Sequence, residues 1–223
     1  MKKIAIPGDE ISSIPKRVNG TYIDKGKTYA STITMVDSDT GHLLPLEGAW
    51  SPRLNDTVVG VVTMVKNHVY EVDLSHFGRG LIIEGKFDKL SLSVGDIVDA
   101  RVRDIEDRKT VILENPRKLY GGILVSIKPA KVPRVIGKEN TMVKTISSIT
   151  GSRLAVGYNG TIWISGGDQS AALIAIEVIE NEAHTSGLTE RVRIMLEKIV
   201  KPEFKELQKQ REKNERENKT DWE

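Results

Sequence analysis

Cysteine is absent from the 223 residues, aromatic side chains make up only 5% of them, and neither charge sign dominates. Without cysteine the chain can form no disulfide, no thiol nucleophile and no cysteine-ligated zinc site. The few aromatic rings provide little material for a broad base-stacking surface. A net charge of +2 neither favours nor excludes a nucleic-acid partner, so the distribution of charge along the chain has to decide.

Long apolar runs are missing as well. The longest, from Ala171 to Ile176, is far shorter than the roughly 20 residues that span a bilayer. The first residues include two lysines, Lys2 and Lys3, but no apolar segment follows them, so they do not form a signal peptide. We therefore expect a soluble cytoplasmic protein with no membrane partner.

Residues 1–55 contain short β-rich segments separated by turn sequences. Pro7-Gly8-Asp9, Asn19-Gly20 and Ser51-Pro52 are typical turns, and residues 29–36 between them favour a strand. No helical period is visible in this part of the sequence. We expect a small N-terminal β domain.

Residues 56–116 continue the β pattern with longer segments. Val58 to Val65 is almost wholly β-branched, and the polar stretches 93–96 and 104–109 are expected turns. The predicted strands are 58–65, 68–74, 81–83, 97–102 and 110–113. Five strands in about sixty residues are typical of the S1-type OB-fold barrel.

Residues 117–200 combine a first strand at 123–127 with helical periodicity between Val135 and Ile149. Gly151 is a C-cap candidate, and Asn159-Gly160 predicts a hairpin between two β segments. Asp168 and Ser170 are N-cap candidates for a helix over 171–183, and Thr189 is one for a last helix. The order βααββα is that of a type I KH domain.

Residues 201–223 hold seven basic and seven acidic side chains and almost nothing apolar, which predicts a charged tail, either an exposed helix or a disordered end. The expected fold class is therefore multidomain, β plus α/β: a small N-terminal β domain, an S1-type OB barrel, a type I KH domain and the tail.

Positive charge is concentrated in the third domain. Residues 1–55 carry seven basic and six acidic side chains, residues 56–116 eight and eleven, and residues 117–200 eleven and seven. A stretch of 26 residues contains six cations against the single acid Glu139: Lys128, Lys131, Arg134, Lys138, Lys144 and Arg153. Cations that neutralise phosphates release counterions and give salt-dependent affinity, although a solvated helix face would have the same composition.

Several motifs stand in an order that matches one known family. They are Pro7-Gly8-Asp9, Gly20-Thr21-Tyr22, Ala30-Ser31, residues 52–62, residues 133–138, and Gly157-Tyr158-Asn159-Gly160 followed by Ile162-Trp163-Ile164. Over residues 1 to about 200 the chain resembles the S1–KH RNA-binding cap subunits of the archaeal exosome, the ribosomal-RNA-processing protein 4 family. The Gly-x-Asn-Gly sequence is the most specific of these motifs.

The resemblance implies a non-catalytic subunit that binds single-stranded RNA and guides its 3′ end to the active sites of a ring of RNase-PH-like subunits. It implies three cap subunits per ring, which can include the zinc-ribbon-type cap subunit, with the N-terminal domain docked on the ring. No cofactor or metal is implied.

The candidate RNA-binding residues lie in two groups. In the barrel they are Lys66, His68, Tyr70, His76, Phe77 and Arg79, and in the KH region they are the six cations given above. We expect Tyr70 to be exposed for base stacking, while Phe77 could either contact RNA or pack into the barrel. Trp163 is expected to pack in the core or between domains rather than to stack on bases.

Four residues, Gly137, Gly157, Asn159 and Gly160, are expected to have structural roles in the KH signature. The loop Gly137-Lys138-Glu139-Asn140 departs from the Gly-x-x-Gly of KH domains, because Asn140 replaces the second glycine and Glu139 repels phosphate.

The sequence offers little support for a catalytic function. Asp104, Glu106 and Asp107 lie among basic residues on one polar stretch, and no further carboxylate motif or phosphate-binding loop accompanies them. The rival functions are a scaffold that clamps ring subunits with little RNA affinity, an S1–KH transcription factor, and a metal-dependent nuclease.

Overall fold

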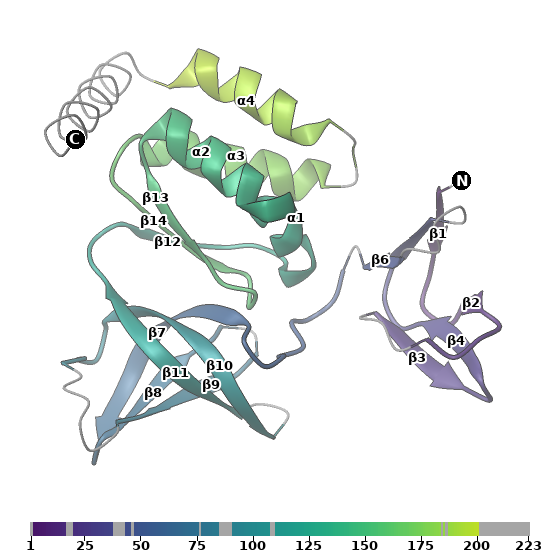
Figure 1. The fold of residues 1–223 in the computed structure, drawn as a ribbon, viewed down its shortest axis with the longest axis horizontal. Coiled ribbons are helices and arrows are strands. Elements are labelled where there is room, and N and C mark those ends of the chain that lie inside the picture. Colours follow the sequence, from purple (N-terminus) through teal and green to yellow (C-terminus); the bar gives the residue numbers. More distant parts are fainter. Residues whose placement is uncertain are drawn as a thin grey trace, which may run out of the picture. The chain divides into compact units, whose positions relative to one another are not determined.

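A computed structural model describes residues 2–16, 20–37, 43–45, 47–75, 77–84, 91–107, 110–183, 185 and 187–200. The chain forms two compact units, shown as a ribbon in Figure 1. The first unit comprises Met1–Leu119, Ser126–Val132 and Gly157–Thr161. The second comprises Tyr120–Val125, Pro133–Val156 and Ile162–Glu223. The tail at 201–223 lies outside the described residues.

The N-terminal residues form two three-stranded sheets with the orders β1-β5-β6 and β2-β4-β3. The strands are β1 (Lys2–Ala5), β2 (Glu10–Ser12), β3 (Thr21–Asp24), β4 (Lys27–Ala30), β5 (Thr34–Asp37) and β6 (Leu43–Pro45). The buried Thr28 hydroxyl donates to the Ile14 carbonyl at 2.8 Å and accepts from the Lys16 amide at 2.8 Å. The expected small β domain is confirmed.

Five strands then close into a barrel in the order β10-β11-β9-β8-β7. They are β7 (Thr57–Lys66), β8 (Val69–Asp73), β9 (Arg79–Ile83), β10 (Ile97–Asp107) and β11 (Thr110–Leu119). Alternate residues such as Val98, Ala100 and Val102 on β10 point into an apolar core. The pairing of β11 with β9 is parallel and the other pairings are antiparallel, so the OB-type barrel expected from the sequence is confirmed.

Strand β10 extends further than the sequence predicted. The stretch 104–109 was expected to be a turn, but β10 continues to Asp107 and pairs with β11 up to Thr110. Arg103, Asp104 and Glu106 are exposed. Polar side chains can therefore occupy this part of the strand, although their sequence is typical of a turn.

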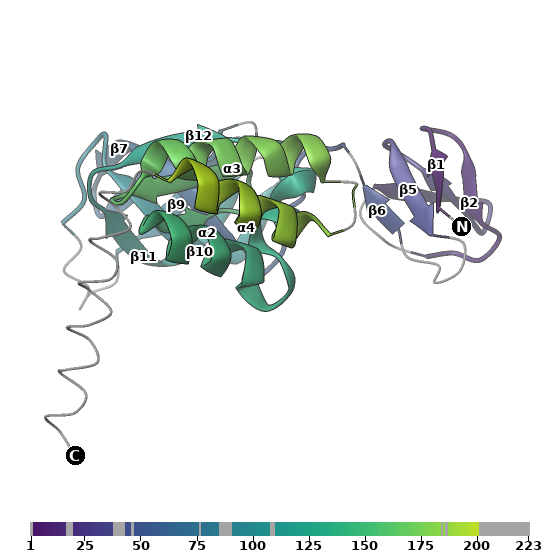
Figure 2. The same ribbon diagram turned by 90° about the horizontal axis from the view of Figure 1, so that it is seen from above.

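The KH elements follow in the order βααββα. They are β12 (Ile123–Ser126), the 3-10 turn η1 (Pro129–Lys131), α1 (Val132–Ile136), the 3-10 turn η2 (Lys138–Asn140), α2 (Thr141–Thr150), β13 (Arg153–Val156), β14 (Thr161–Ser165) and α3 (Gln169–Glu182), with α4 (Leu188–Ile199) added. The sheet order is β12-β14-β13. Helices α2, α3 and α4 pack together on one side of this sheet (Figures 1 and 2).

Helix ends in this region follow local sequence signals in two of three cases. Gly151 ends α2 in the left-handed conformation with φ 70°, and the Asp168 carboxylate accepts from the Ala171 amide at 3.0 Å at the start of α3. The predicted cap at Thr189 is wrong, because α4 begins at Leu188 with Gly187 at its N-cap. Leu188 is buried, so the apolar face of the helix already starts there.

Candidate nucleic-acid interface

The predicted barrel residues begin at the β7–β8 turn. Lys66 is the last residue of β7, and His68 has a left-handed backbone with φ 65°. Both side chains are exposed, and His68 Nδ1 lies 2.9 Å from the Glu84 carboxylate. This turn therefore presents a cation and an imidazole to solvent at one end of the barrel.

Tyr70 does not lie on this surface. The prediction that it is exposed is wrong, because only 5% of the residue is accessible and it belongs to the barrel core. Tyr70 and Val72 are two residues apart and share a face, so the burial of Val72 carries Tyr70 inward with it. Its hydroxyl donates to the Glu84 carboxylate at 3.4 Å, and burial raises the pKa of this phenol, with Glu84 contributing.

Phe77 and Arg79 lie at the start of β9. The Phe77 ring packs edge-on against Trp50, with centroids 4.8 Å apart, and both rings contact the barrel core. Of the two alternatives expected for Phe77, RNA contact or packing into the barrel, the structure shows packing into the barrel. Arg79 is exposed, but its guanidinium contacts Thr110 Oγ1 at 3.3 Å and Glu71 at 3.5 Å. His76 lies outside the described residues.

The strand register separates these residues into two places. Val69 pairs with Ile83 at one end of β8, and Asp73 pairs with Arg79 at the other. Lys66 and His68 therefore lie at the opposite end of β8 from Phe77 and Arg79. The barrel residues predicted to bind RNA therefore do not come together in one place within the described part of the chain.

The KH loop has a strained backbone. Glu139 and Asn140 are both left-handed, with φ 54° and 62°. A Cβ at Gly137 would lie 2.7 Å from the Met142 amide nitrogen, so only glycine fits there. Lys138 and Glu139 are both exposed, and the loop therefore presents one cation and one anion to solvent.

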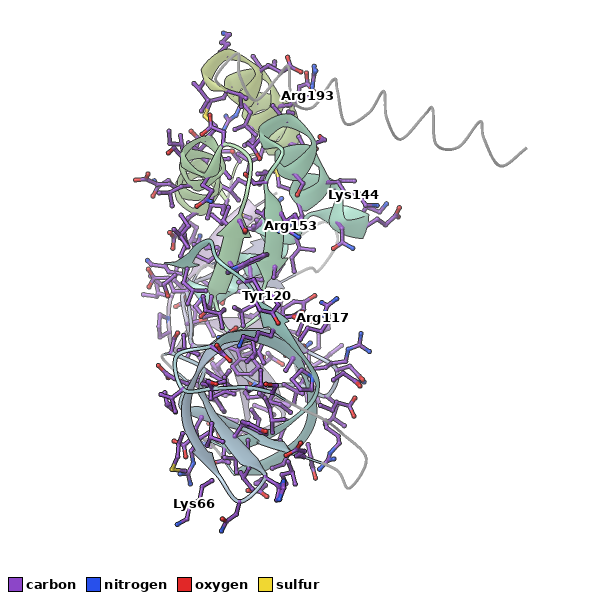
Figure 3. All side chains as sticks on the ribbon, turned by 90° about the vertical axis from the view of Figure 1, so that its left-hand side faces the viewer. Lys66, Arg117, Tyr120, Lys144, Arg153 and Arg193 are labelled. Atoms are coloured by element: carbon purple, nitrogen blue, oxygen red, sulfur yellow. The ribbon has the colours of Figure 1, made fainter. Side chains whose placement is uncertain are left out.

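Four of the six KH cations belong to the second unit. Arg134, Lys138, Lys144 and Arg153 make no side-chain hydrogen bond or ion pair within the described part of the chain. Figure 3 shows Arg153 on β13 beside α2, the helix that carries Lys144. Lys128 and Lys131 belong to the first unit, and Lys128 pairs with Glu47 at 3.0 Å.

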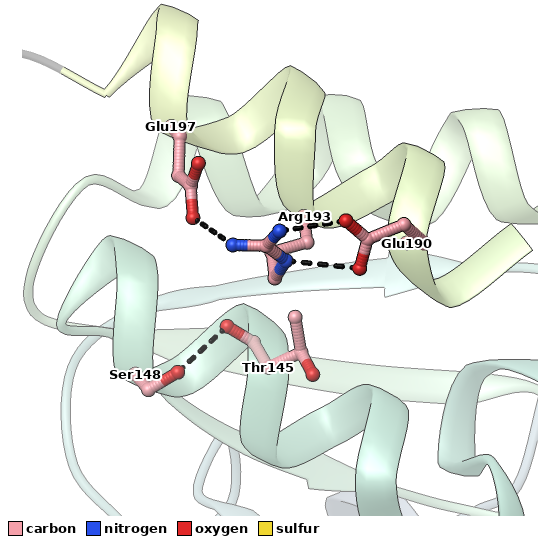
Figure 4. Close-up of polar contacts among 5 residues, drawn as sticks. All are labelled: Thr145, Ser148, Glu190, Arg193 and Glu197. Atoms are coloured by element: carbon pink, nitrogen blue, oxygen red, sulfur yellow. Dashed lines mark hydrogen bonds and ion pairs between the residues drawn. The ribbon is translucent and has the colours of Figure 1, made fainter.

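The arginines of α4 are different, because carboxylates neutralise them. Arg193 Nε and Nη2 donate to Glu190 at 3.0 and 2.6 Å, and Nη1 donates to Glu197 at 2.6 Å (Figure 4). These contacts hold the pKa of Arg193 above its usual value. Arg191 pairs with Glu182. The cations on α1, η2, α2 and β13 are not neutralised in this way within the described residues, and Lys198 on α4 also makes no ion pair there.

The loop Gly157–Gly160 binds strand β7 within the first unit. The buried Asn159 side chain accepts from the Val59 amide at 3.2 Å and donates to the Val59 carbonyl at 2.8 Å and to Thr161 Oγ1 at 3.1 Å. The Tyr158 amide donates to the Thr57 carbonyl at 2.8 Å. A Cβ at Gly157 would lie 2.6 Å from the Val59 nitrogen, and one at Gly160 would lie 2.4 Å from the Ile127 oxygen. These contacts give the Gly-x-Asn-Gly loop a structural role.

Trp163 is buried in the KH sheet, with 5% of the residue accessible, and its indole N–H donates to the Gly121 carbonyl at 2.6 Å. The expectation of a core position for Trp163 is confirmed.

The sequence analysis missed a polar pocket on the outer face of the barrel. It has a volume of about 480 Å³ and is lined chiefly by Thr57, Asp99, Arg101, Asn115, Pro116 and Arg117. Asp99 and Arg117 are cross-strand partners, although eighteen positions separate them in the sequence. Only the strand register reveals this pairing, and the Asn-Pro pair within a strand was the one available signal.

Among the described residues no group of three or more histidine, aspartate or glutamate side chains could hold a metal ion. Within the same residues, no helix is both long and apolar enough to cross a membrane.

Comparisons with known proteins agree with this architecture. A family model described as KH domain matches residues 122–170. The chain is similar to the exosome complex component Rrp4 of Methanosarcina mazei, with 38% identity over 86% of this chain and 80% of the relative. The Methanothermus fervidus component of the same name is 34% identical over 86% of this chain and 94% of the relative. A crystal structure whose description assigns it to the exosome complex RNA-binding proteins matches with a TM-score of 0.57 and 29% identity, covering 68% of this chain and 97% of the other.

Proposed function

This chain belongs to the Rrp4 family of exosome complex components, and from that membership we propose that it is an RNA-binding cap subunit of an exosome. In this role it captures RNA and guides single-stranded 3′ ends toward the active sites of RNase-PH-like ring subunits. The chain itself contributes no catalytic group, and it acts in the cytoplasm as one of three caps on a ring.

The observation that carries this proposal is the set of uncompensated cations in the second unit. Arg134, Lys138, Lys144 and Arg153 have no partner carboxylate within the described residues, whereas Arg191 and Arg193 on α4 do. An unpaired surface cation can exchange its counterion for a phosphate, and this exchange favours binding at low salt. Charge distribution therefore supports RNA capture along α1, η2, α2 and β13.

The N-terminal sheets have surface properties that suit docking on a protein ring. Ile4, Ile6 and Ile14 are 60%, 58% and 65% exposed, on strands or turns of a small domain. Large exposed apolar side chains are a feature that protein interfaces can cover. We assign ring docking to this domain and RNA contact to the barrel and KH elements.

Reconstitution with the ring tests the proposal. We expect the full chain to increase the rate and processivity with which the ring degrades adenylate-rich RNA, because each cap raises the local RNA concentration. Equal rates and equal processivity with and without the chain would contradict a guiding role.

A variant with fewer cations distinguishes a subunit that guides RNA from a scaffold that only clamps the ring subunits. This cation variant replaces Lys138, Lys144 and Arg153, all exposed, with glutamine. The matched control variant replaces the exposed, ion-paired Lys27, Arg191 and Arg193 with glutamine, an equal change in formal charge. A guiding subunit loses stimulation only in the cation variant. A scaffold, for which the strained Glu139–Asn140 loop is the best support, stimulates equally with both.

A further inference from the structure

The outer face of β10 carries Asp99, whose carboxylate pairs with Arg117 on β11. Val98, Ala100 and Val102 point into the core, so Asp99 and Arg101 between them point outward. Nevertheless only 2% of Asp99 is accessible. A buried carboxylate loses hydration, and a single ion pair seldom stabilises the fold enough to compensate for that loss. This cost suggests that the pair has another role.

Asp99 holds the guanidinium of Arg117 in one orientation. Arg117 Nε lies 3.1 Å from both carboxylate oxygens, and Nη2 donates to Oδ2. The Arg117 side chain is itself 78% exposed, so its outer N–H groups face solvent. A guanidinium held by a buried carboxylate loses less side-chain entropy when it binds a ligand than a mobile lysine does.

A β-bulge shapes the pocket beside this pair. Asp99 pairs with Arg117 and Arg101 pairs with Glu114, so Asn115 and Pro116 together oppose the single residue Ala100. Asn115 has a left-handed backbone with φ 50°, and Pro116 has no amide hydrogen for the ladder. Bulges of this kind redirect side chains and often lie next to functional sites.

The lining of the pocket is rich in donors. Arg101 and Thr57 are cross-strand partners, and Arg101 has no side-chain hydrogen bond or ion pair within the described residues. The side chains of Asn115 and Thr57 add an amide and a hydroxyl. The lining residues carry two guanidinium groups and one carboxylate, Asp99, which Arg117 already occupies. Glu114, the cross-strand partner of Arg101, is a further carboxylate next to the pocket lining.

We propose that this pocket is a phosphodiester-binding subsite for single-stranded RNA, in which Arg101 and Arg117 hold one phosphate group. Planar guanidinium groups bind phosphate oxygens through two parallel hydrogen bonds. The volume of about 480 Å³ suits a nucleotide-sized ligand. The inference rests on the RNA-binding function proposed above, and it adds a subsite that none of the sequence candidates contains.

The subsite lies away from the β7–β8 turn. Figure 3 shows Lys66 at the far end of the barrel from Arg117. A strand of RNA held at both places would run along the outside of the barrel.

Nuclear magnetic resonance of the full chain tests the subsite. The probes are the dinucleotide ApA, which has one phosphodiester, adenosine, which has none, and inorganic phosphate. We expect ApA to shift the Asn115 side-chain amide and the Arg117 Nε–H signals, and we expect adenosine to leave them unchanged. Arg101→Gln should weaken ApA binding roughly tenfold, as expected for the loss of a charge-assisted contact.

Arg103→Gln is the matched control, because Arg103 is exposed on the same strand but does not line the pocket. Equal effects of the two substitutions, or RNA binding without shifts at Asn115 and Arg117, would overturn the subsite and leave the RNA-binding function intact. Shifts with inorganic phosphate but not with ApA would identify a free-anion site and also overturn it. No binding of any RNA by the wild-type chain would overturn the proposed function itself.

Discussion

At the scale of single residues, the KH loop combines a favourable and an unfavourable charge. Lys138 can approach a phosphate, while the adjacent Glu139 repels it from a left-handed backbone with φ 54°. The charge of Glu139 opposes phosphate binding at this loop, and its left-handed backbone lowers the stability of the loop.

Removing the Glu139 charge should therefore strengthen RNA binding. We expect Glu139→Gln to increase the affinity for oligoadenylate roughly threefold, because one repulsive charge near phosphate is lost. Glu139→Gly should have the same effect and should also raise the free energy of unfolding by about 0.5 kcal/mol, since glycine relieves the left-handed strain. Fluorescence anisotropy and urea unfolding measure the two quantities, and unchanged affinity in both variants would show that RNA does not approach this loop.

The burial of Tyr70 predicts how its ionisation and the stability of the fold depend on pH. Burial, together with Glu84, raises the pKa of its phenol above the usual value of about 10. In the folded state the neutral phenol is favoured, so its contribution to stability is complete below about pH 10 and is lost as the pH rises through the folded pKa. Tyrosinate absorbance should show one of the five tyrosines ionising late, and Tyr70→Phe should remove that late step. A spectrum in which all tyrosines ionise together would contradict the buried position.

At the scale of elements, the Gly157–Gly160 loop depends on a single amide side chain. Asn159→Ala should lower the free energy of unfolding by about 3 kcal/mol, because the Val59 amide and carbonyl lose their partner in a buried position. Asn181→Ala on the exposed face of α3 is the control and should change stability little. Urea unfolding of both variants gives the comparison, and equal stabilities would mean that water replaces the lost bonds.

The elements also show what could be predicted from sequence. Alternation and turn residues were sufficient for the five barrel strands, the Asn159-Gly160 hairpin and the Asp168 cap, because each depends on neighbours in the chain. Tyr70 was misplaced because it was assigned to the face opposite both Val69 and Val72, whereas it shares a side of the strand with Val72. The Asp99–Arg117 pocket could not be predicted, because it requires the β10–β11 register and the bulge at Asn115–Pro116.

At the scale of the whole molecule, the proposed RNA capture depends on which cations remain unpaired rather than on the net charge of +2. Arg191 and Arg193 on α4 and Lys27 in the N-terminal sheets are held by carboxylates, as in Lys27–Glu10 at 2.8 Å. The cations of η2, α2 and β13 are not held in this way within the described residues. A nearly neutral chain can therefore bind RNA through a local excess of positive charge.

The most direct measurement is the salt dependence of oligoadenylate binding by the wild-type chain, the cation variant and the control variant. We expect the logarithm of affinity to fall with the logarithm of salt concentration, and the slope to become shallower by about 2 in the cation variant, since three phosphate contacts are lost. The control variant, with the same formal charge, should keep the wild-type slope. A wild-type affinity that does not respond to salt, or equal slopes in all three proteins, would contradict the account.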